Sequence, residues 1–382
     1  MKDHAAPPYA ATLKPTVRAD ASTKTRGLPR RSGAYDAQTP RGAPAGFEMH
    51  AFLMSSLRRR LVLAATGAAF LAASAGATAQ PEAAAYPARP IRIVVTFTPG
   101  GAPDILARLI GERLAVSWGQ PVIVDNKPGA GGNTGADFVA KSPADGYTLV
   151  VGTVGTHSIN GALYARMPYD MVRDFAPVTL LATTPNMLVI NNDVPAKNLT
   201  EFIALGKKVG KMSFASSGSG TSIHVSGELF KTMTGIDMDH IPYKGRATAI
   251  PDVLGGRVTM MFDNMPSSLP LVREGRLRAL GVTSLQRSAA APEIPTLAEQ
   301  GLAGFEAVSW FALFAPAGTP RPVVDKLQGE VKKILASPDI AKRLAEAGLD
   351  AVGSSPDELA AYQRSEIVKW AKVVKDSGAK AE

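Results

Sequence analysis

The chain has 382 residues, 45% of them apolar, and no cysteine. This composition is typical of a globular protein with more than one domain, and the lack of cysteine excludes disulfides, thiolate metal sites and cysteine nucleophiles. The net charge of +9 comes mostly from residues 1–79, which hold 11 Lys and Arg against 4 Asp and Glu and leave 31 basic and 29 acidic residues in 80–382. This balance argues against a nucleic-acid partner.

A secretory signal peptide is predicted ahead of the folded part of the chain. Its basic segment is Arg58–Arg60, its apolar segment runs from Leu61 to Ala73, and small residues ending in Ala77-Thr78-Ala79 complete it. These are the three parts of such a peptide, and the apolar segment is too short and too rich in small residues for a spanning helix. We expect cleavage after Ala79 and export of residues 80–382.

Residues 1–48 precede two further methionines, Met49 and Met54. This stretch is rich in Pro, Ala, Arg and Thr and has no apolar periodicity, so we expect a disordered extension or a misassigned start. The signal peptide then occupies residues 49–79. No second long apolar stretch follows it in the sequence, and we expect the exported chain to be soluble outside the cytoplasmic membrane.

The first part of the exported chain alternates predicted strands and helices. The strands occupy 91–97, 122–124 and 147–151, and the helices occupy 104–118 and 136–141. Gly, Pro and Asn separate them, most densely in the loop 129–135, and helix 104–118 carries its apolar residues on one face. Such alternation is the pattern of a parallel sheet wound by helices.

The same pattern recurs in a second unit of similar length. Its strands occupy 213–216, 240–243, 258–262 and 277–283, and its helices occupy 222–233, 247–254 and 268–274. Because Pro242 cannot donate a hydrogen bond to a neighbouring strand, segment 240–243 is predicted at a sheet edge. Each unit has roughly the hundred residues of a typical domain.

Two apolar strands join the two units. Strand 178–190, interrupted at Pro185, leads out of the first unit, and strand 309–315 leads back into it. We therefore expect a discontinuous lobe I, residues 80–184 plus 309–382, and an inserted lobe II, residues 185–308. Helices predicted at 322–336, 339–347 and 356–375 would pack on lobe I.

Loops of Gly, Ser and Thr follow three of the strands, at 98–101, 152–156 and 217–221. In open α/β sheets, ligands bind beyond the carboxyl ends of the strands. The backbone N–H groups that begin the next helix lack partners and attract carboxylate or phosphate. A single loop of this kind is ordinary turn chemistry, but their presence in both units indicates a cleft that binds an anion.

Four further side chains allow a structural or a functional interpretation. Asp104 stands where a helix N-cap belongs, and its other carboxylate oxygen could face the cleft. His157, in the loop after the third strand, either reaches the cleft or is a polar surface residue. His224 and Glu228, spaced i and i+4, could share a metal, although a helix-stabilising pair or a cleft-lining histidine is favoured because no third ligand is visible.

Polar residues also cluster in the second unit. Lys244 or Arg246, following Tyr243, either offers a positive charge to an acid or lies in a solvated loop. Asp263 and Asn264 follow a predicted strand at the same sheet edge as the glycine loops, as a turn signal or as a pair that faces a ligand.

Sequence patterns of common enzymes are missing. Thr134 stands where a dinucleotide-binding glycine loop needs its third glycine, no Walker-type phosphate loop occurs, and Ser219 has glycine immediately on each side instead of the spacing of a hydrolase nucleophile. We therefore predict no catalytic residue, no metal site and no cofactor.

Several motifs resemble one family over residues 86–376. They are Tyr86-Pro87-x-Arg89-Pro90-Ile91, Phe97-Thr98-Pro99-Gly100-Gly101-x-x-Asp104-x-x-Ala107-Arg108, Val124-Asp125-Asn126-Lys127-Pro128-Gly129-Ala130-Gly131-Gly132-Asn133-x-Gly135, Pro143-Ala144-Asp145-Gly146-Tyr147-Thr148-Leu149, Gly218-Ser219-Gly220-Thr221 with His224, and Pro242-Tyr243-Lys244-Gly245. Together they resemble the Bug-type extracytoplasmic solute receptors, the substrate-binding components of tripartite tricarboxylate transporters.

The resemblance implies an α/β fold of the type II periplasmic-binding-protein kind, a two-lobed Venus flytrap in which each lobe is a wound sheet flanked by helices. The two crossings, at Thr183–Pro185 and Val308–Trp310, would be the hinge. Ligand carboxylates would be held by backbone N–H groups, hydroxyls and water. The implied ligand-binding residues are Phe97, Thr98, Pro99, Gly100, Gly101, Asp104, Thr153, Thr156, His157, Ser217, Gly218, Ser219, Gly220, Thr221, Tyr243 and Asp263.

The implied function is that of a periplasmic solute-binding protein that captures a small carboxylate for the permease subunits of a tripartite tricarboxylate transporter. Thr98, Ala102 and Pro103 stand at positions that vary in the family, so the ligand stays open among dicarboxylates, tricarboxylates, amino acids, aromatic acids and nicotinate-like compounds. Two alternatives are an exported hydrolase that uses a Ser or His of the cleft, and a receptor that passes its closed form to a membrane sensor kinase.

Overall fold

The computed structural model describes residues 86–381, so the predicted extension (1–48) and signal peptide (49–79) lie outside the described residues. Ten strands of the described chain form one mixed sheet, with the order β2-β1-β3-β9-β4-β7-β5-β6 and with β8 and β10 joined to β4. Two of these strands, β4 (Phe175–Asn191) and β9 (Val308–Pro316), divide the sheet into two halves.

The first half is built from parallel strands on one side of β9. Strand β1 (Ile91–Val95) lies between β2 (Val122–Asn126) and β3 (Thr148–Thr153) and is parallel to both. The connecting helices are α3 (Ala102–Trp118), η1 (Ala130–Gly132) and α4 (Asn133–Ala140), and η2 (Gly155–Ile159) and α5 (Asn160–Leu163) follow β3. The sequence did not predict η2 and α5.

The second half repeats this construction beyond β4. Strand β5 (Met212–Ser216) lies between β6 (Met238–Pro242) and β7 (Met260–Asn264), parallel to both, and β8 (Leu277–Val282) pairs with β4. Its helices are α6 (Leu199–Val209), α7 (Ser222–Thr234), α8 (Arg246–Leu254) and α9 (Met265–Arg273). Strand β6 lies at the sheet edge, as its proline predicted.

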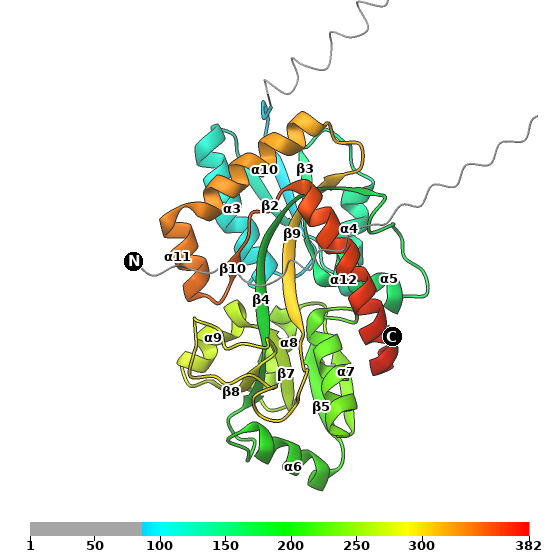
Figure 1. The fold of residues 1–382 in the computed structure, drawn as a ribbon, viewed down its shortest axis with the longest axis vertical. Coiled ribbons are helices and arrows are strands. Elements are labelled where there is room, and N and C mark those ends of the chain that lie inside the picture. Colours follow the sequence, from blue (N-terminus) through cyan, green and yellow to red (C-terminus); the bar gives the residue numbers. More distant parts are fainter. Residues whose placement is uncertain (1–85, 382) are drawn as a thin grey trace, which may run out of the picture. The chain divides into compact units, whose positions relative to one another are not determined.

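Strand β4 connects the halves and lies antiparallel beside β9 (Figure 1). The predicted interruption at Pro185 is wrong, because β4 continues through it. Pro185 is opposite Val308 at the end of the β4–β9 ladder, and from Asn186 onward β4 pairs with β7 and β8. A residue without an N–H is tolerated where the strand changes partners.

The C-terminal segment returns to the first half of the sheet. Its elements are α10 (Arg321–Ala336), α11 (Pro338–Glu346), β10 (Asp350–Ala351) and α12 (Pro356–Ser377). Helix α10 packs on α3 and β4 of the first half, as expected. Helix α12 contacts η2, α5 and β4, but unlike the prediction it also contacts α7 of the second half. The fold class is therefore confirmed as α/β, with two wound half-sheets flanked by helices and joined by two crossing strands.

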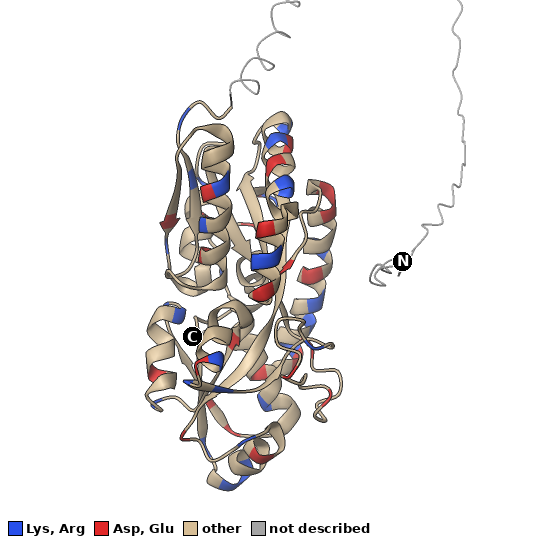
Figure 2. Ribbon diagram, turned by 90° about the vertical axis from the view of Figure 1, so that its left-hand side faces the viewer, with Lys and Arg blue, Asp and Glu red and all other residues tan. Residues whose placement is uncertain are grey.

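The charged residues of the described chain are dispersed. Figure 2 shows basic and acidic positions alternating along the helices, in keeping with the near balance of charge beyond residue 79. Among residues 86–381, no helix combines the length and apolar character needed to cross a membrane.

Three histidines lie among aromatic rings, and of these His157 and His224 are buried and His240 is partly buried. His157 stacks on Phe314, with 4.1 Å between the ring centroids, and His224 stacks on His240 at 4.0 Å. Burial disfavours the charged imidazolium. It lowers the pKa of His157 and of His224 to about 3 and that of His240 to about 4, and the neighbouring Lys231 adds to the effect at the last two.

These histidines predict that acid destabilises the protein. Between pH 6.5 and 5.5 the unfolded chain binds protons that the folded chain does not, so stability present above pH 6.5 is lost as the pH falls. We expect each buried histidine to reduce the free energy of unfolding by about 1 kcal/mol over this interval, measured by urea unfolding at each pH. His157→Phe should remove about a third of the dependence; equal stability at both pH values would contradict the account.

A buried carboxylate joins β9 to α12. Glu366, 7% exposed, accepts hydrogen bonds from the indole Nε1 atoms of Trp310 (3.1 Å) and Trp370 (2.8 Å), which are both fully buried. The bond from Trp310 attaches α12 to β9, one of the two crossing strands, and the bond from Trp370 lies within α12.

Replacing this carboxylate tests its role in the packing of α12. Glu366→Leu leaves two buried N–H groups without partners, at about 1–3 kcal/mol each, so the urea midpoint followed by tryptophan fluorescence should fall markedly. The control Val368→Ala changes a side chain on the same helix that is 73% exposed, and should shift the free energy of unfolding by less than about 0.5 kcal/mol. A wild-type midpoint for Glu366→Leu would exclude this role.

Candidate functional site

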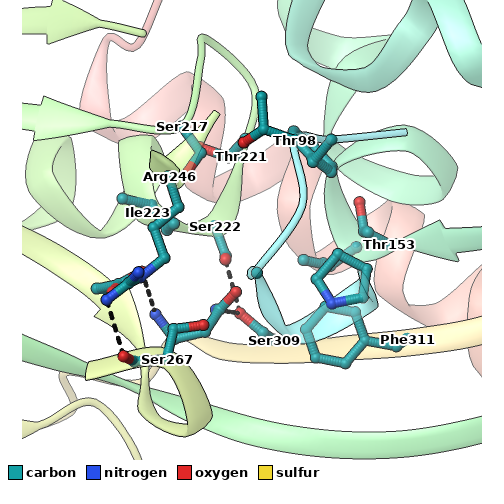
Figure 3. A pocket seen from close by; sticks show the side chains of 16 residues that line it. Thr98, Thr153, Ser217, Thr221, Ser222, Ile223, Arg246, Ser267, Ser309 and Phe311 are labelled. Atoms are coloured by element: carbon teal, nitrogen blue, oxygen red, sulfur yellow. Dashed lines mark hydrogen bonds and ion pairs between the residues drawn. The ribbon is translucent and has the colours of Figure 1, made fainter. Parts of the chain in front are cut away.

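A cavity lies where strands from both halves of the sheet end (Figure 3). The space between its lining atoms is about 480 Å³, which includes a part that is open to solvent. Its lining residues are Phe97, Thr98, Gly101, Pro103, Thr153, Val154, Ser217, Thr221, Ser222, Ile223, Arg246, Asp263, Asn264, Ser267, Ser309 and Phe311. The cavity thus lies at the strand ends that the sequence predicted.

Four helices of the described chain begin at residues that line this cavity. Gly101 is the N-cap of α3, Thr221 of α7 and Asn264 of α9, and Arg246 is the first residue of α8. The first N–H groups of a helix have no partner within it, and they carry the positive end of the helix dipole. Helices from both halves therefore direct partial positive charge at one small volume, which favours an anion.

The floor of the cavity is a buried network of polar side chains. Ser309 Oγ lies 2.6 Å from Ser222 Oγ and accepts a hydrogen bond from Asn264 Nδ2 at 2.9 Å. Asn264 Nδ2 also donates to Asn186 Oδ1 at 2.7 Å, and Asn186 Nδ2 donates to Ser226 Oγ at 3.0 Å. Because Asn186 and Ser309 belong to β4 and β9, the floor is fixed to the two crossing strands.

The walls between the helix starts are apolar. Phe97 and Phe311 contribute rings, and Val154, Ile223 and Pro103 complete the apolar surface. An apolar wall excludes water and strengthens the electrostatic effect of the N–H groups around it.

One ion pair stands at the cavity wall in the second half. Arg246 Nε donates to Asp263 Oδ2 at 2.6 Å, and Arg246 Nη2 donates to the carbonyl of Ser267 at 2.8 Å. The side chain of Asp263 is 1% exposed and that of Arg246 is 15% exposed. Asp263 also accepts hydrogen bonds from Ser268 Oγ and from the backbone N–H of Asn264, so its charge is fully balanced.

The structure brings together seven of the sequence-predicted ligand residues at this cavity. They are Phe97, Thr98, Gly101, Thr153, Ser217, Thr221 and Asp263. Gly218, Ser219 and Tyr243 instead line an adjoining cavity with the loop 129–132, and this cavity shares Phe97 and Ser217 with the first. The phenol of Tyr164 donates to the Ser219 carbonyl at 2.9 Å across the space between the halves.

Two neutral histidines hold the loop that contains Ser217–Gly220. The backbone N–H of Gly220 donates to His224 Nδ1 at 3.2 Å. The Oγ of Ser216 lies 2.6 Å from His240 Nε2 and accepts a hydrogen bond from the Gly218 N–H at 3.0 Å. Gly220 therefore supports the loop and lines neither cavity.

Asp104 supports the first glycine loop from behind. The N-cap prediction is wrong, because α3 already begins at Ala102, after Gly101. The carboxylate accepts from the Gly100 N–H (2.9 Å), Arg108 Nε (3.0 Å) and Asn126 Nδ2 (3.0 Å). Burial alone would raise its pKa, but these hydrogen bonds outweigh burial and lower the pKa below the ordinary value. Pro99, Gly100 and Asp104 line neither cavity.

Thr156 and His157 lie beneath the third loop. Thr156 Oγ1 accepts from the Thr153 N–H at 3.0 Å and lies 2.8 Å from His157 Nδ1. Both side chains are fully buried and line neither cavity. The aromatic stack on Phe314 explains why a histidine after a strand end is turned into the core instead of the cleft.

Sequence reasoning missed several lining residues. Ser222 and Ile223 begin the helix after a predicted loop, and Ser309 and Phe311 alternate along a predicted strand. Both pairs of positions follow from the predicted elements.

The pair His224 and Glu228, considered above as a metal site, is joined by a third residue of opposite charge to the glutamate. His224 Nε2 lies 3.9 Å from Glu228, which also pairs with Lys231 at 3.1 Å. No cluster of three His, Asp or Glu that could hold a metal ion occurs in the described part of the chain.

Comparisons with known proteins identify the family of this chain. Residues 106–379 match the family described as tripartite tricarboxylate transporter family receptor. The chain is 40% identical over 310 residues to the protein BugT of Bordetella pertussis, covering 81% of this chain and 95% of that one.

Two solved structures of Rhodopseudomonas palustris proteins share the fold. Rpa4515, solved with adipate, is 40% identical with a TM-score of 0.76 and covers 78% of this chain and 100% of its own. MatC, solved with bound malate, is 35% identical to this chain with a TM-score of 0.73. The match covers 76% of this chain and 100% of MatC. With the family match and the Bug-named relative, they show that this chain belongs to the Bug-type receptor family of tripartite tricarboxylate transporters.

Proposed function

We propose that this protein is a periplasmic receptor that captures a small carboxylate between the two halves of its sheet and delivers it to the permease subunits of a tripartite tricarboxylate transporter. The observation that carries the proposal is the convergence of four helix starts, from both halves, on one cavity with apolar walls. The adipate and malate bound by the two relatives support carboxylates as the ligand class.

The hydrogen-bonding groups of the site suit a transport receptor. N–H groups and hydroxyls bind an anion without a buried counterion for each charge, which would be costly to desolvate. Such contacts also allow the ligand to leave unchanged, as a carrier requires. A ligand that is recovered unchanged separates this function from that of an exported hydrolase.

We further propose that residues 80–184 plus 309–382 and residues 185–308 move as two lobes about the crossings at Thr183–Pro185 and Val308–Trp310. The crossings pair with one another in a single ladder, which suits a hinge in which two adjacent strands bend together. Contacts between the halves, such as the Ala247 N–H with Thr98 Oγ1 at 3.4 Å, would form on closure.

Ligand capture predicts thermal stabilisation. The exported protein, screened against organic acids, should rise in melting temperature with one or more small carboxylates, because a ligand that binds only the folded state stabilises it. Chromatography of the released ligand should recover it intact. Consumption of the acid would indicate an enzyme, and the absence of any stabilisation across carboxylates would exclude the proposed function.

Closure predicts that a small side chain at Gly245 weakens binding. A Cβ there would overlap the Thr98 hydroxyl of the facing half, so Gly245→Ala should reduce carboxylate affinity at least ten-fold, about 1.4 kcal/mol. Thr98→Gly in the same chain should restore part of the affinity. Gly245 has φ +152°, which strains any side chain, so rescue by Thr98→Gly separates overlap from backbone strain. The control Gly235→Ala places a Cβ in open space at φ +69°, and calorimetry should find its affinity unchanged. Unchanged affinity in Gly245→Ala would argue against closure at this contact.

A further inference from the structure

We propose that Arg246 determines the specificity of the cavity by binding a second carboxylate of the ligand, and that the preferred ligand is a dicarboxylate with an apolar body. The inference rests on the proposed function and adds the ligand class. Its basis is the arrangement of one charged side chain, one balanced carboxylate and apolar walls around the same cavity.

Arg246 has hydrogen-bond donors to spare. A guanidinium carries five N–H donors in a planar fork. Of these, Nε donates to Asp263 and one Nη2 hydrogen donates to the Ser267 carbonyl, whereas Nη1 forms no hydrogen bond with any described residue. These two bonds fix the plane of the guanidinium at the cavity wall, leaving donors suited to a carboxylate.

Asp263 is the reason that Arg246 matters for specificity. Its Oδ2 accepts from Arg246 and Ser268 and its Oδ1 accepts from the Asn264 N–H, so the arginine already supplies the cation that pairs with this carboxylate. Without Arg246, Asp263 would be a buried anion at the cavity wall and would favour a cationic group. Arg246 therefore changes the preference of this end of the cavity from ammonium to carboxylate.

The opposite end of the cavity carries no charged side chain. Figure 3 shows Thr153 and Phe311 on the side away from Arg246 and Ser267, and Thr153 offers a hydroxyl there. The N-cap Gly101 of α3 also lines the cavity. A first carboxylate would bind at these groups and a second at Arg246. Phe97, Phe311 and Ile223 line the same cavity and offer apolar surface to the methylene groups of such a ligand.

Three acids of matched length test the proposal by calorimetry on the exported protein: adipate, hexanoate and 6-aminohexanoate. The wild type should bind adipate at least ten-fold more tightly than hexanoate, and 6-aminohexanoate no better than hexanoate. Arg246→Ala should weaken adipate at least thirty-fold and should bind 6-aminohexanoate more tightly than adipate, because Asp263 becomes available. Arg246→Ala with Asp263→Asn should discriminate little among the three acids.

Controls separate loss of specificity from loss of folding. Arg257→Ala removes an arginine of the same half that pairs with Asp252 and is 66% exposed, and it should keep the wild-type order of affinities. The double variant avoids the unpaired buried charge that could unfold Arg246→Ala, and circular dichroism melts verify that each variant is folded.

Two results would overturn the proposal. The first is an Arg246→Ala protein, or a folded double variant, that keeps the wild-type ratio of adipate to hexanoate affinity. The second is a wild type that is stabilised by other carboxylates but does not prefer adipate to hexanoate; this result leaves the proposed receptor function intact. Failure of every carboxylate in the thermal screen would instead reject the receptor function itself.

Discussion

Backbone N–H groups at the starts of α3, α7, α8 and α9 are the constraint on which the rest of the site depends. A helix must leave its first N–H groups without internal partners, and a parallel sheet places successive helix starts at one edge. Two half-sheets facing each other across β4 and β9 therefore concentrate such groups from both sides. An anion between the halves pairs with donors that would otherwise depend on water.

The crossing strands link this site to the rest of the molecule. Asn186 on β4 and Ser309 on β9 belong to the hydrogen-bond network of the cavity floor. Trp310, next to Ser309, donates a hydrogen bond to Glu366 of α12. The buried apolar core also continues from the first half through β4 into the second. In the proposed closure, a ligand held between the halves would act directly on the elements that connect them.

Most of the fold could be predicted from the sequence because its signals are local. Glycine-rich breaks and apolar periodicity placed most strands and helices within a few residues, and their alternation gave the parallel half-sheets. Helix α6 (Leu199–Val209) was not predicted. Continuity of β4 through Pro185 could not be predicted, because it depends on a change of pairing partner that only the folded sheet reveals. Asp104 was wrongly predicted as a helix N-cap because α3 begins two residues earlier than expected, at Ala102. A difference of this size is within the usual uncertainty of helix ends.

The site was predicted at the level of loops better than at the level of side chains. Loops after β1, β3 and β5 do reach the cavity, but whether a given side chain points inward depends on packing: His157 turns to Phe314, and Asp104 turns to Arg108. The pairing of Arg246 with Asp263 joins residues 17 positions apart on different elements, and no sequence spacing indicates it.

The most direct test of this account is amide NMR of the ¹⁵N-labelled protein as an organic acid is added. The acid is adipate or, if adipate does not bind, the one that raises the melting temperature most. The account predicts that amide protons at the starts of helices in both halves, among them Gly101, Ser222 and Met265, shift downfield together at saturation as they donate to the ligand. Shifts confined to one half, or none at these positions while the acid is bound, would contradict it.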